Sequence, residues 1–214
     1  MRYVIRKVPE RDTSYLEALL PDAEIYNDHD YVKPLLSFIE ALRMRAGSAI
    51  YFQDDVVLCT GFLEKSAKEI EQRVNDVILF SEIYFAGRAT IASGYCDPIK
   101  NNWMYAIYIP EWVRDATLRI WDNSELIPTK WEIKNGSDDT WFGRVMQYIG
   151  IQPYMIVPNL AGHTKAESVA NKKWDKEYRL SPTFDYENCE NRGIDLTKEI
   201  KWLHKNNDRI WGKR

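Results

Sequence analysis

The chain has 214 residues, of which 45% are hydrophobic and 29% charged, and a net charge of −3. This length allows one full-sized domain, alone or with an appendage, and a substantial core. The composition is ordinary for a globular protein, and the net charge excludes a global electrostatic attraction to nucleic acid.

From this sequence we expect no membrane span, no signal peptide and no cysteine-based framework. No segment approaches the roughly 18 apolar residues of a membrane span, and the N-terminal apolar stretch is too short for a signal peptide. Cys59, Cys96 and Cys189 are widely spaced and form no C-x-x-C motif, which argues against a disulfide framework and a structural zinc site. We therefore expect a cytoplasmic protein with reduced cysteines and a buried Cys59.

Strands and helices are expected to alternate along the first part of the chain. The predicted strands cover residues 1–8, 23–28 and 49–52, and the predicted helices cover residues 14–21, 31–45 and 61–76. Pro34 falls in the first turn of the second helix, where a missing N–H is tolerated, and Gly47 ends that helix.

The alternation continues after a strand at residues 77–81 and an irregular segment at residues 86–102. A strand from Trp103 leads into a helix after Pro110, and a further helix is expected between an N-cap at Ser137 and a stop at Gly150. A late strand covers residues 153–159. This order predicts an α/β fold with a mainly parallel sheet, in which ligands bind beyond the carboxyl ends of the strands.

Two adjacent carboxylates, Asp54 and Asp55, follow the apolar strand that begins at Ala49. Neighbouring carboxylates repel each other, and a divalent cation with oxygen ligands would compensate them. The alternative is a turn in which the aspartates only accept backbone hydrogen bonds. Both interpretations remain open from the residues alone.

His163 and Lys165 follow the late strand, behind Pro158 and Gly162, in a segment that we expect to be an irregular loop. A neutral imidazole can complete a metal shell, and a lysine ammonium can neutralise a diphosphate. A single loop histidine is more often only solvated, so His163 gains meaning from its combination with the acidic pair.

Five segments follow one another in an order that resembles a known family. They are residues 4–28, a helix, and residues 49–62, 138–150 and 157–168. They are similar to the small GT-A-fold glycosyltransferases of bacteriophages, distant relatives of the lipooligosaccharide and collagen galactosyltransferase type. The resemblance covers about residues 1–170, and the Asp54–Asp55 and Pro158–His163 segments are its most specific parts. It implies a GT-A-like (Rossmann-type) mixed, mainly parallel sheet flanked by helices, with residues 171–214 as a C-terminal helical extension packing on it.

The resemblance assigns the acidic pair to a metal-binding motif. Gln53 stands where relatives commonly carry Glu or Asp, which leaves Asp55 as the direct metal ligand. Asp54 would then face the donor's ribose or a bound water.

Four other residues receive roles around the donor from the same resemblance. Arg6 and Arg11 would lie beside the nucleotide, His163 would be the C-terminal metal ligand, and Lys165 would contact the diphosphate. The implied cofactor is Mn²⁺ or Mg²⁺, and the implied donor is a nucleotide-diphosphate sugar, with UDP-sugar favoured.

Asp138 and Asp139 open the predicted helix that ends at Gly150. The resemblance places an acidic residue there to face the acceptor, where it would remove the hydroxyl proton or orient the sugar. Acidic residues in a first helical turn are also favourable through capping and the helix dipole alone.

The tail after residue 170 interleaves aromatic and basic residues, a composition that single-stranded nucleic acid binding requires. These residues are Trp174, Lys176, Tyr178, Arg179, Trp202, Lys205, Arg209 and Trp211. The alternative is an amphipathic helix whose tryptophans pack on the domain.

The resemblance thus implies a glycosyltransferase, with a hydroxymethylated base in phage DNA as one acceptor, in the host cytoplasm if a phage encodes it. One alternative is an acceptor that is a saccharide or a protein, which the acidic net charge favours. Another is a non-catalytic module that binds a nucleotide sugar or nucleic acid.

Overall fold

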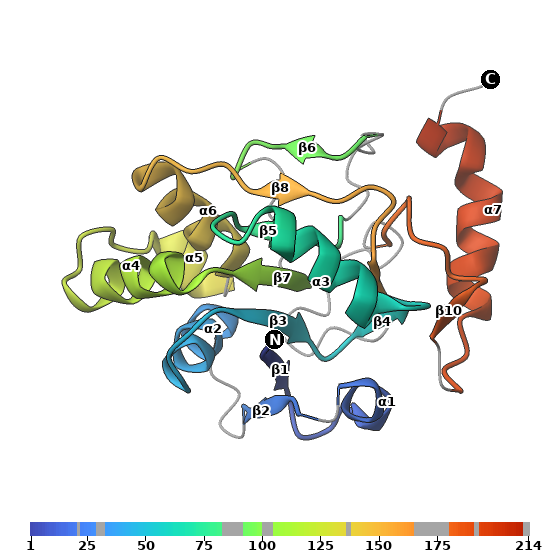
Figure 1. The fold of residues 1–214 in the computed structure, drawn as a ribbon, viewed down its shortest axis with the longest axis horizontal. Coiled ribbons are helices and arrows are strands. Elements are labelled where there is room, and N and C mark those ends of the chain that lie inside the picture. The colour runs from blue at the N-terminus through green and yellow to red at the C-terminus, as the bar shows by residue number, and fades with distance from the viewer. Residues whose placement is uncertain are drawn as a thin grey trace.

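The structure, a computed structural model, describes residues 1–20, 22–28, 33–82, 92–99, 105–135, 138–164, 180–190 and 193–211. Within these ranges it is an α/β fold in which helices flank a seven-stranded sheet (Figure 1). The strands of this sheet are β1 (Tyr3–Lys7), β2 (Glu24–Asn27), β3 (Ala49–Gln53), β5 (Ile78–Leu79), β6 (Gly94–Tyr95), β7 (Ala106–Ile109) and β8 (Tyr154–Met155).

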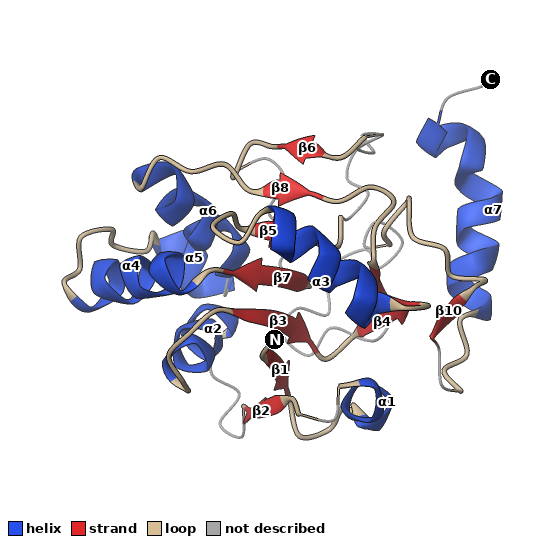
Figure 2. Ribbon diagram, in the orientation of Figure 1, coloured by secondary structure: helices blue, strands red, loops and turns tan. Residues whose placement is uncertain are grey.

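The large sheet is mixed, and most of its strands run in one direction. Its described order is β2-β1-β3-β7-β5-β8-β6 (Figure 2). β1 is parallel to β2 and β3, and β5 is parallel to β8, whereas β7 and β6 run against their neighbours. The predicted α/β class with a mainly parallel sheet is therefore confirmed.

Helices cover both faces of this sheet. One face packs against α2 (Pro34–Arg43), α4 (Glu111–Asp122) and α6 (Asp138–Tyr148). The other face packs against α1 (Ser14–Leu19) and α3 (Phe62–Gln72), and α3 crosses in front of the sheet in Figure 1. The short α5 (Lys130–Asn135), which the sequence did not predict, precedes α6.

The sequence pattern accounts for the helix that covers β1 and β3. Leu35, Phe38 and Leu42 recur at helical spacing in α2 and are all buried. Pro34 opens the helix, where its fixed φ is tolerated. At the end of α6, Gly150 takes a φ of +76°, which a residue with a side chain rarely adopts.

A second, smaller sheet continues from the end of β3. It contains β10 (Cys189–Glu190), β4 (Val56–Cys59) and β9 (Ala161–His163), all antiparallel. The prediction of an irregular loop up to His163 was therefore wrong, because residues 161–163 form a strand that gives β4 its hydrogen-bonding partner. Gly162 permits this, because an added Cβ there would lie 2.5 Å from the Phe184 ring.

The irregular segment expected at residues 86–102 is only partly described. Gly94 and Tyr95 within it form β6, which pairs with β8. The predicted roles of Trp103 and Ser137 fall outside the described residues.

The described part of the tail packs on the small sheet. Leu180, Phe184, Tyr186, Leu196 and Trp202 form a buried cluster with Val57 of β4. Trp202 lies in α7 (Thr197–Trp211) and is 6% exposed, so the packing alternative is confirmed for this tryptophan. The boundary at residue 170 stays a prediction. Each helix within the described ranges is too short or too polar to span a membrane.

Candidate functional site

The acidic pair lies where the two sheets meet. Asp54 and Asp55 form the turn between β3 and β4, at the carboxyl end of β3. This position is the one expected for a ligand site in a mainly parallel sheet. The segment after β1 and the end of β9 approach the same turn.

Arg11, from the segment after β1, bridges the two carboxylates. Its guanidinium lies 2.5 Å from Asp54 Oδ1 and 2.7 Å from Asp55 Oδ2. The Val8 backbone N–H also donates to Asp54 Oδ2, at 3.0 Å. Two of the predicted donor-binding residues, Arg11 and Asp54, are therefore in direct contact.

His163 closes the other side of the pair. Its Nε2 lies 3.0 Å from Asp55 Oδ2, and the two side chains are 1% and 4% exposed. The antiparallel pairing of β4 with β9 sets this contact, because Val56 is the register partner of His163 and the Thr164 N–H donates to Asp55 O. The two predicted metal ligands are thus adjacent, although 108 residues separate them in the chain.

Three tyrosines that the sequence analysis did not identify surround this group. The Tyr105 ring meets the His163 imidazole edge-on with ring centroids 4.3 Å apart. The Tyr186 hydroxyl donates to His163 O, and the Tyr15 hydroxyl donates to Val56 O. No motif marks these tyrosines, which come from three distant segments and contact β4 or β9.

Burial and charge shape the ionisation of the cluster. Burial raises the pKa of Asp54 to about 6, and the charge of Asp55 adds to this rise, while Arg11 and the Val8 N–H oppose it. Burial alone would lower the pKa of Arg11, but the charges of Asp55 and Asp54 outweigh it and raise that pKa. Arg11 is therefore permanently charged, and one guanidinium faces two carboxylates.

Asp55 and His163 are suited to hold one divalent ion together. Two neighbouring ligands of an octahedral ion, each about 2.1 Å from it, are roughly 3 Å apart. Asp55 Oδ2 and His163 Nε2 are 3.0 Å apart, a separation that is also typical of a hydrogen bond, and the same oxygen lies 2.7 Å from Arg11. Carboxylate oxygen and imidazole nitrogen suit such ions. Within the described ranges no three His, Cys, Asp or Glu side chains are grouped around one ion position, so a substrate's phosphates would have to contribute ligands.

Arg6 and Asp138, predicted to serve the nucleotide and the acceptor, contact each other instead. Arg6 Nη2 lies 2.6 Å from Asp138 Oδ2, and both side chains are 8% exposed. The guanidinium also lies over the Phe38 ring, 5.3 Å from its centroid, and donates to Pro34 O. This pair connects β1 to the first residue of α6.

Two predicted site residues remain, Asp139 and Lys165. Asp139 is half-buried, and its carboxylate accepts the Thr140 N–H at 2.7 Å, which is a local helix-start contact. Lys165 lies outside the described residues.

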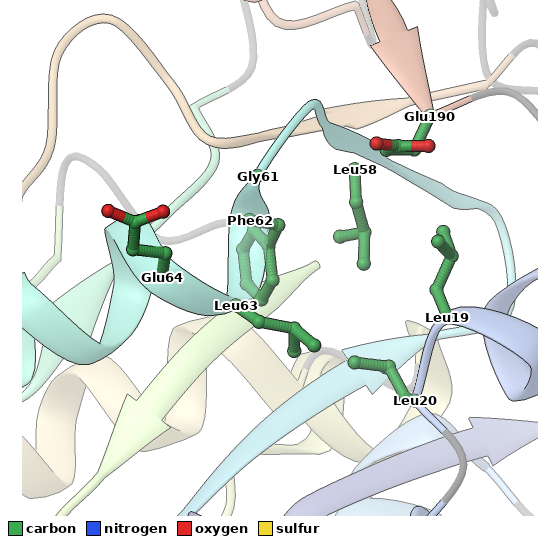
Figure 3. A pocket seen from close by; sticks show the side chains of 8 residues that line it. All are labelled: Leu19, Leu20, Leu58, Gly61, Phe62, Leu63, Glu64 and Glu190. Atoms are coloured by element: carbon green, nitrogen blue, oxygen red, sulfur yellow. The ribbon is translucent and has the colours of Figure 1, made fainter.

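An apolar cavity of about 230 Å³ lies near the small sheet but apart from the acidic pair. Figure 3 shows the side chains that line it, which come from α1, β4, the start of α3 and β10. They are Leu19, Leu20, Leu58, Gly61, Phe62, Leu63, Glu64 and Glu190. No predicted site residue contributes to this cavity.

The chain matches no protein-family model, and no curated protein is significantly similar to it.

Proposed function

We propose that this chain is a metal-dependent glycosyltransferase that moves a sugar from a nucleotide-diphosphate sugar, with UDP-sugar favoured, to an acceptor hydroxyl. One observation carries the proposal: Asp55 contacts both Arg11 and His163 at the carboxyl end of β3. The resemblance of residues 1–170 to small GT-A-fold enzymes assigns donor or metal contacts to the same residues. The small sheet beside the turn supports the proposal, because it holds His163 against the acidic pair.

Each residue around the acidic pair has a different role in binding the donor. Asp55 and His163 would hold Mn²⁺ or Mg²⁺, which when bound neutralises the charge that develops on the departing diphosphate. Arg11 then exchanges part of its contact with the carboxylates for the phosphates, where a guanidinium binds well. Asp54 accepts a hydrogen bond from the ribose once Arg11 has moved.

The acceptor side depends on the start of α6. Asp138 and Asp139 are the candidates for removing the acceptor's proton or orienting its sugar. Because Asp138 is bound to Arg6, Asp139 is the stronger candidate of the two. The acceptor remains open between a hydroxymethylated base in DNA and a saccharide or protein hydroxyl.

A second candidate is a module that binds a nucleotide sugar without turning it over. The contact of Arg11 with both carboxylates favours this candidate, because an arginine can compensate the acidic pair without a metal ion. Such a module would bind UDP equally well with and without Mn²⁺.

The test is release of UDP from UDP-glucose with Mn²⁺, with hydroxymethylated DNA or an oligosaccharide as acceptor. We expect release that needs the metal and is lost in Asp55→Asn, whereas Asp122→Asn, which changes an exposed carboxylate paired with Arg43, keeps it. UDP binding without metal dependence and without turnover of any nucleotide sugar would support the binding module and refute the enzyme.

A further inference from the structure

Two of the three cysteines lie directly opposite each other in the small sheet. Cys189 of β10 is the register partner of Cys59 of β4. The two residues are 130 positions apart in the chain, and the tail's return to β4 brings them together. The third, Cys96, lies beside β6, and its thiol donates a hydrogen bond to Pro153 O near β8.

The backbone bonding of β4 shows which type of cross-strand pair this is. The Cys59 N–H donates to Leu160 O at 2.9 Å, on the β9 side of the strand. Its backbone groups therefore point away from β10, and Cys59 and Cys189 form a non-hydrogen-bonded pair. In such pairs the Cα atoms are about 4.5 Å apart and the side chains are at their closest, which falls within the range that a disulfide spans.

Both side chains also point to the same face of the sheet. Leu58 and Glu190, the neighbouring register pair, line the cavity on one face (Figure 3). Because side chains alternate along a strand, Cys59 and Cys189 point to the opposite face. There both pack against the cluster that contains Val57 and Tyr186.

We infer that Cys59 and Cys189 form a reversible disulfide that fastens the tail of this chain to the strand following the acidic pair. In the presence of a low-molecular-weight disulfide, the Cys59 thiolate attacks one of its sulfurs and releases one small thiol. Cys189 then attacks Cys59 Sγ and releases the second. The two protein thiols together lose two electrons and two protons, which appear in the two small thiols.

The surroundings of the two sulfurs assign the first attack to Cys59. Burial raises the pKa of both thiols, that of Cys189 to about 11. The ammonium of Lys65, 4.0 Å from Cys59 Sγ, opposes the rise at Cys59. Both residues are partly exposed, so a small oxidant can reach them, whereas the sequence suggested a buried Cys59.

The bond would close a long loop across the fold. It would join β10 to β4, the strand that begins at Val56 directly after Asp55. β9, on the other side of β4, ends at His163. The proposal does not depend on the glycosyltransferase function, since it concerns only the two thiols and the small sheet.

The test is to incubate the folded, full-length protein with oxidised glutathione across a range of ratios to reduced glutathione. The remaining thiols are then alkylated, and the linked peptides are identified by mass spectrometry. We expect wild type to lose two of its three thiols and to form an intramolecular Cys59–Cys189 link. Because the bond closes a loop of roughly 130 residues, the melting temperature should rise by roughly 10 °C.

Serine variants test whether oxidation is specific to Cys59 and Cys189 or occurs at any thiol. Cys59→Ser and Cys189→Ser should each abolish the link and the shift in melting temperature, whereas Cys96→Ser should retain both. Retention of all three thiols over the whole range would overturn the proposal, as would a link that involves Cys96 or two chains.

Discussion

Two arginine–carboxylate clusters lie at the carboxyl ends of β1 and β3, and they differ in charge balance. Arg6 faces one carboxylate, Asp138, and both side chains are nearly excluded from solvent. Arg11 faces two carboxylates, with His163 against one of them. In the contacts between described residues, the first cluster pairs one guanidinium with one carboxylate, and we call it the neutral cluster. The second pairs one guanidinium with two carboxylates beside an imidazole, and we call it the negative cluster for its excess of carboxylates.

This difference separates a structural contact from a candidate binding site. A buried one-to-one ion pair has its charge compensated, and it holds two elements together. A buried group with one guanidinium and two carboxylates is a candidate cation site, and burial, followed by the charge of Asp55, raises the pKa of Asp54 to about 6.

The largest expected effect is on stability, in the neutral cluster. Asp138→Ala leaves the Arg6 guanidinium buried without its ionic partner, which should lower the free energy of unfolding by about 3–5 kcal/mol. Urea unfolding would measure it. The double variant Arg6→Met with Asp138→Leu should recover most of the loss, because no charge then remains buried. A loss below about 1 kcal/mol in Asp138→Ala would show that the pair does not hold α6 to β1.

The second effect is on binding, in the negative cluster. Asp55→Asn keeps the side-chain volume but removes the carboxylate that contacts His163. We expect the affinity for UDP with Mn²⁺ to fall about 10- to 100-fold in calorimetry, a typical cost of disturbing a metal site. The matched control is Asp138→Asn, which should change this affinity by less than about threefold. Unchanged affinity in a folded Asp55→Asn protein would disprove the assignment of a metal to Asp55.

The third effect is a pH dependence from Asp54. Its pKa in the folded protein is about 6, so a ligand that needs the ionised carboxylate should bind about tenfold more weakly at pH 5 than at pH 7. Calorimetry in buffers of different ionisation enthalpy would also detect proton release on binding near pH 6. Asp54→Asn should remove both effects, whereas persistence of either effect in that variant would assign the titration to another group.

The same pKa has a consequence for stability with a defined sign. A carboxyl whose folded pKa lies above its unfolded value stabilises the fold at acid pH, and this contribution is lost as the pH rises through about 6. The unfolding free energy of wild type relative to Asp54→Asn should therefore decline between about pH 4 and pH 6.

The sequence predicted the fold class and the position of the acidic pair at the end of a strand, because both depend on local signals. Hydrophobic periodicity gave α2, and the acidic pair after an apolar strand marked the end of β3. The combination of His163 with the acidic pair was predicted from residue chemistry and from a resemblance, since periodicity carries no information on which distant strands pair.

The remaining features depend on long-range pairing. Residues 161–163 were expected to be irregular because Pro158 and Gly162 break local patterns, but β4 needs a partner and Gly162 makes room for Phe184. The Arg6–Asp138 contact joins residues 132 positions apart. The raised pKa of Asp54 depends on burial, which no sequence motif reports.

The smallest expected effect tests whether the two clusters are separate, and it uses Gln53. This residue is the register partner of Arg6 and lies two positions after Tyr51, whose side chain packs on the α2 side of the sheet. Because side chains alternate along β3, the Gln53 side chain lies on the face of the sheet that carries Arg6 and Phe38. We therefore expect the uncharged side chain at position 53 to have little effect on an ion at Asp55.

Gln53→Glu should therefore change the affinity for UDP with Mn²⁺ by less than about twofold. It should lower the free energy of unfolding by about 0.5–1 kcal/mol, because a second carboxylate is added near the buried Arg6–Asp138 pair. Calorimetry and urea unfolding of the same preparation would measure both. A tenfold gain in metal-dependent affinity would mean that the residue 53 side chain reaches the ion, and that the neutral and negative clusters act as one site.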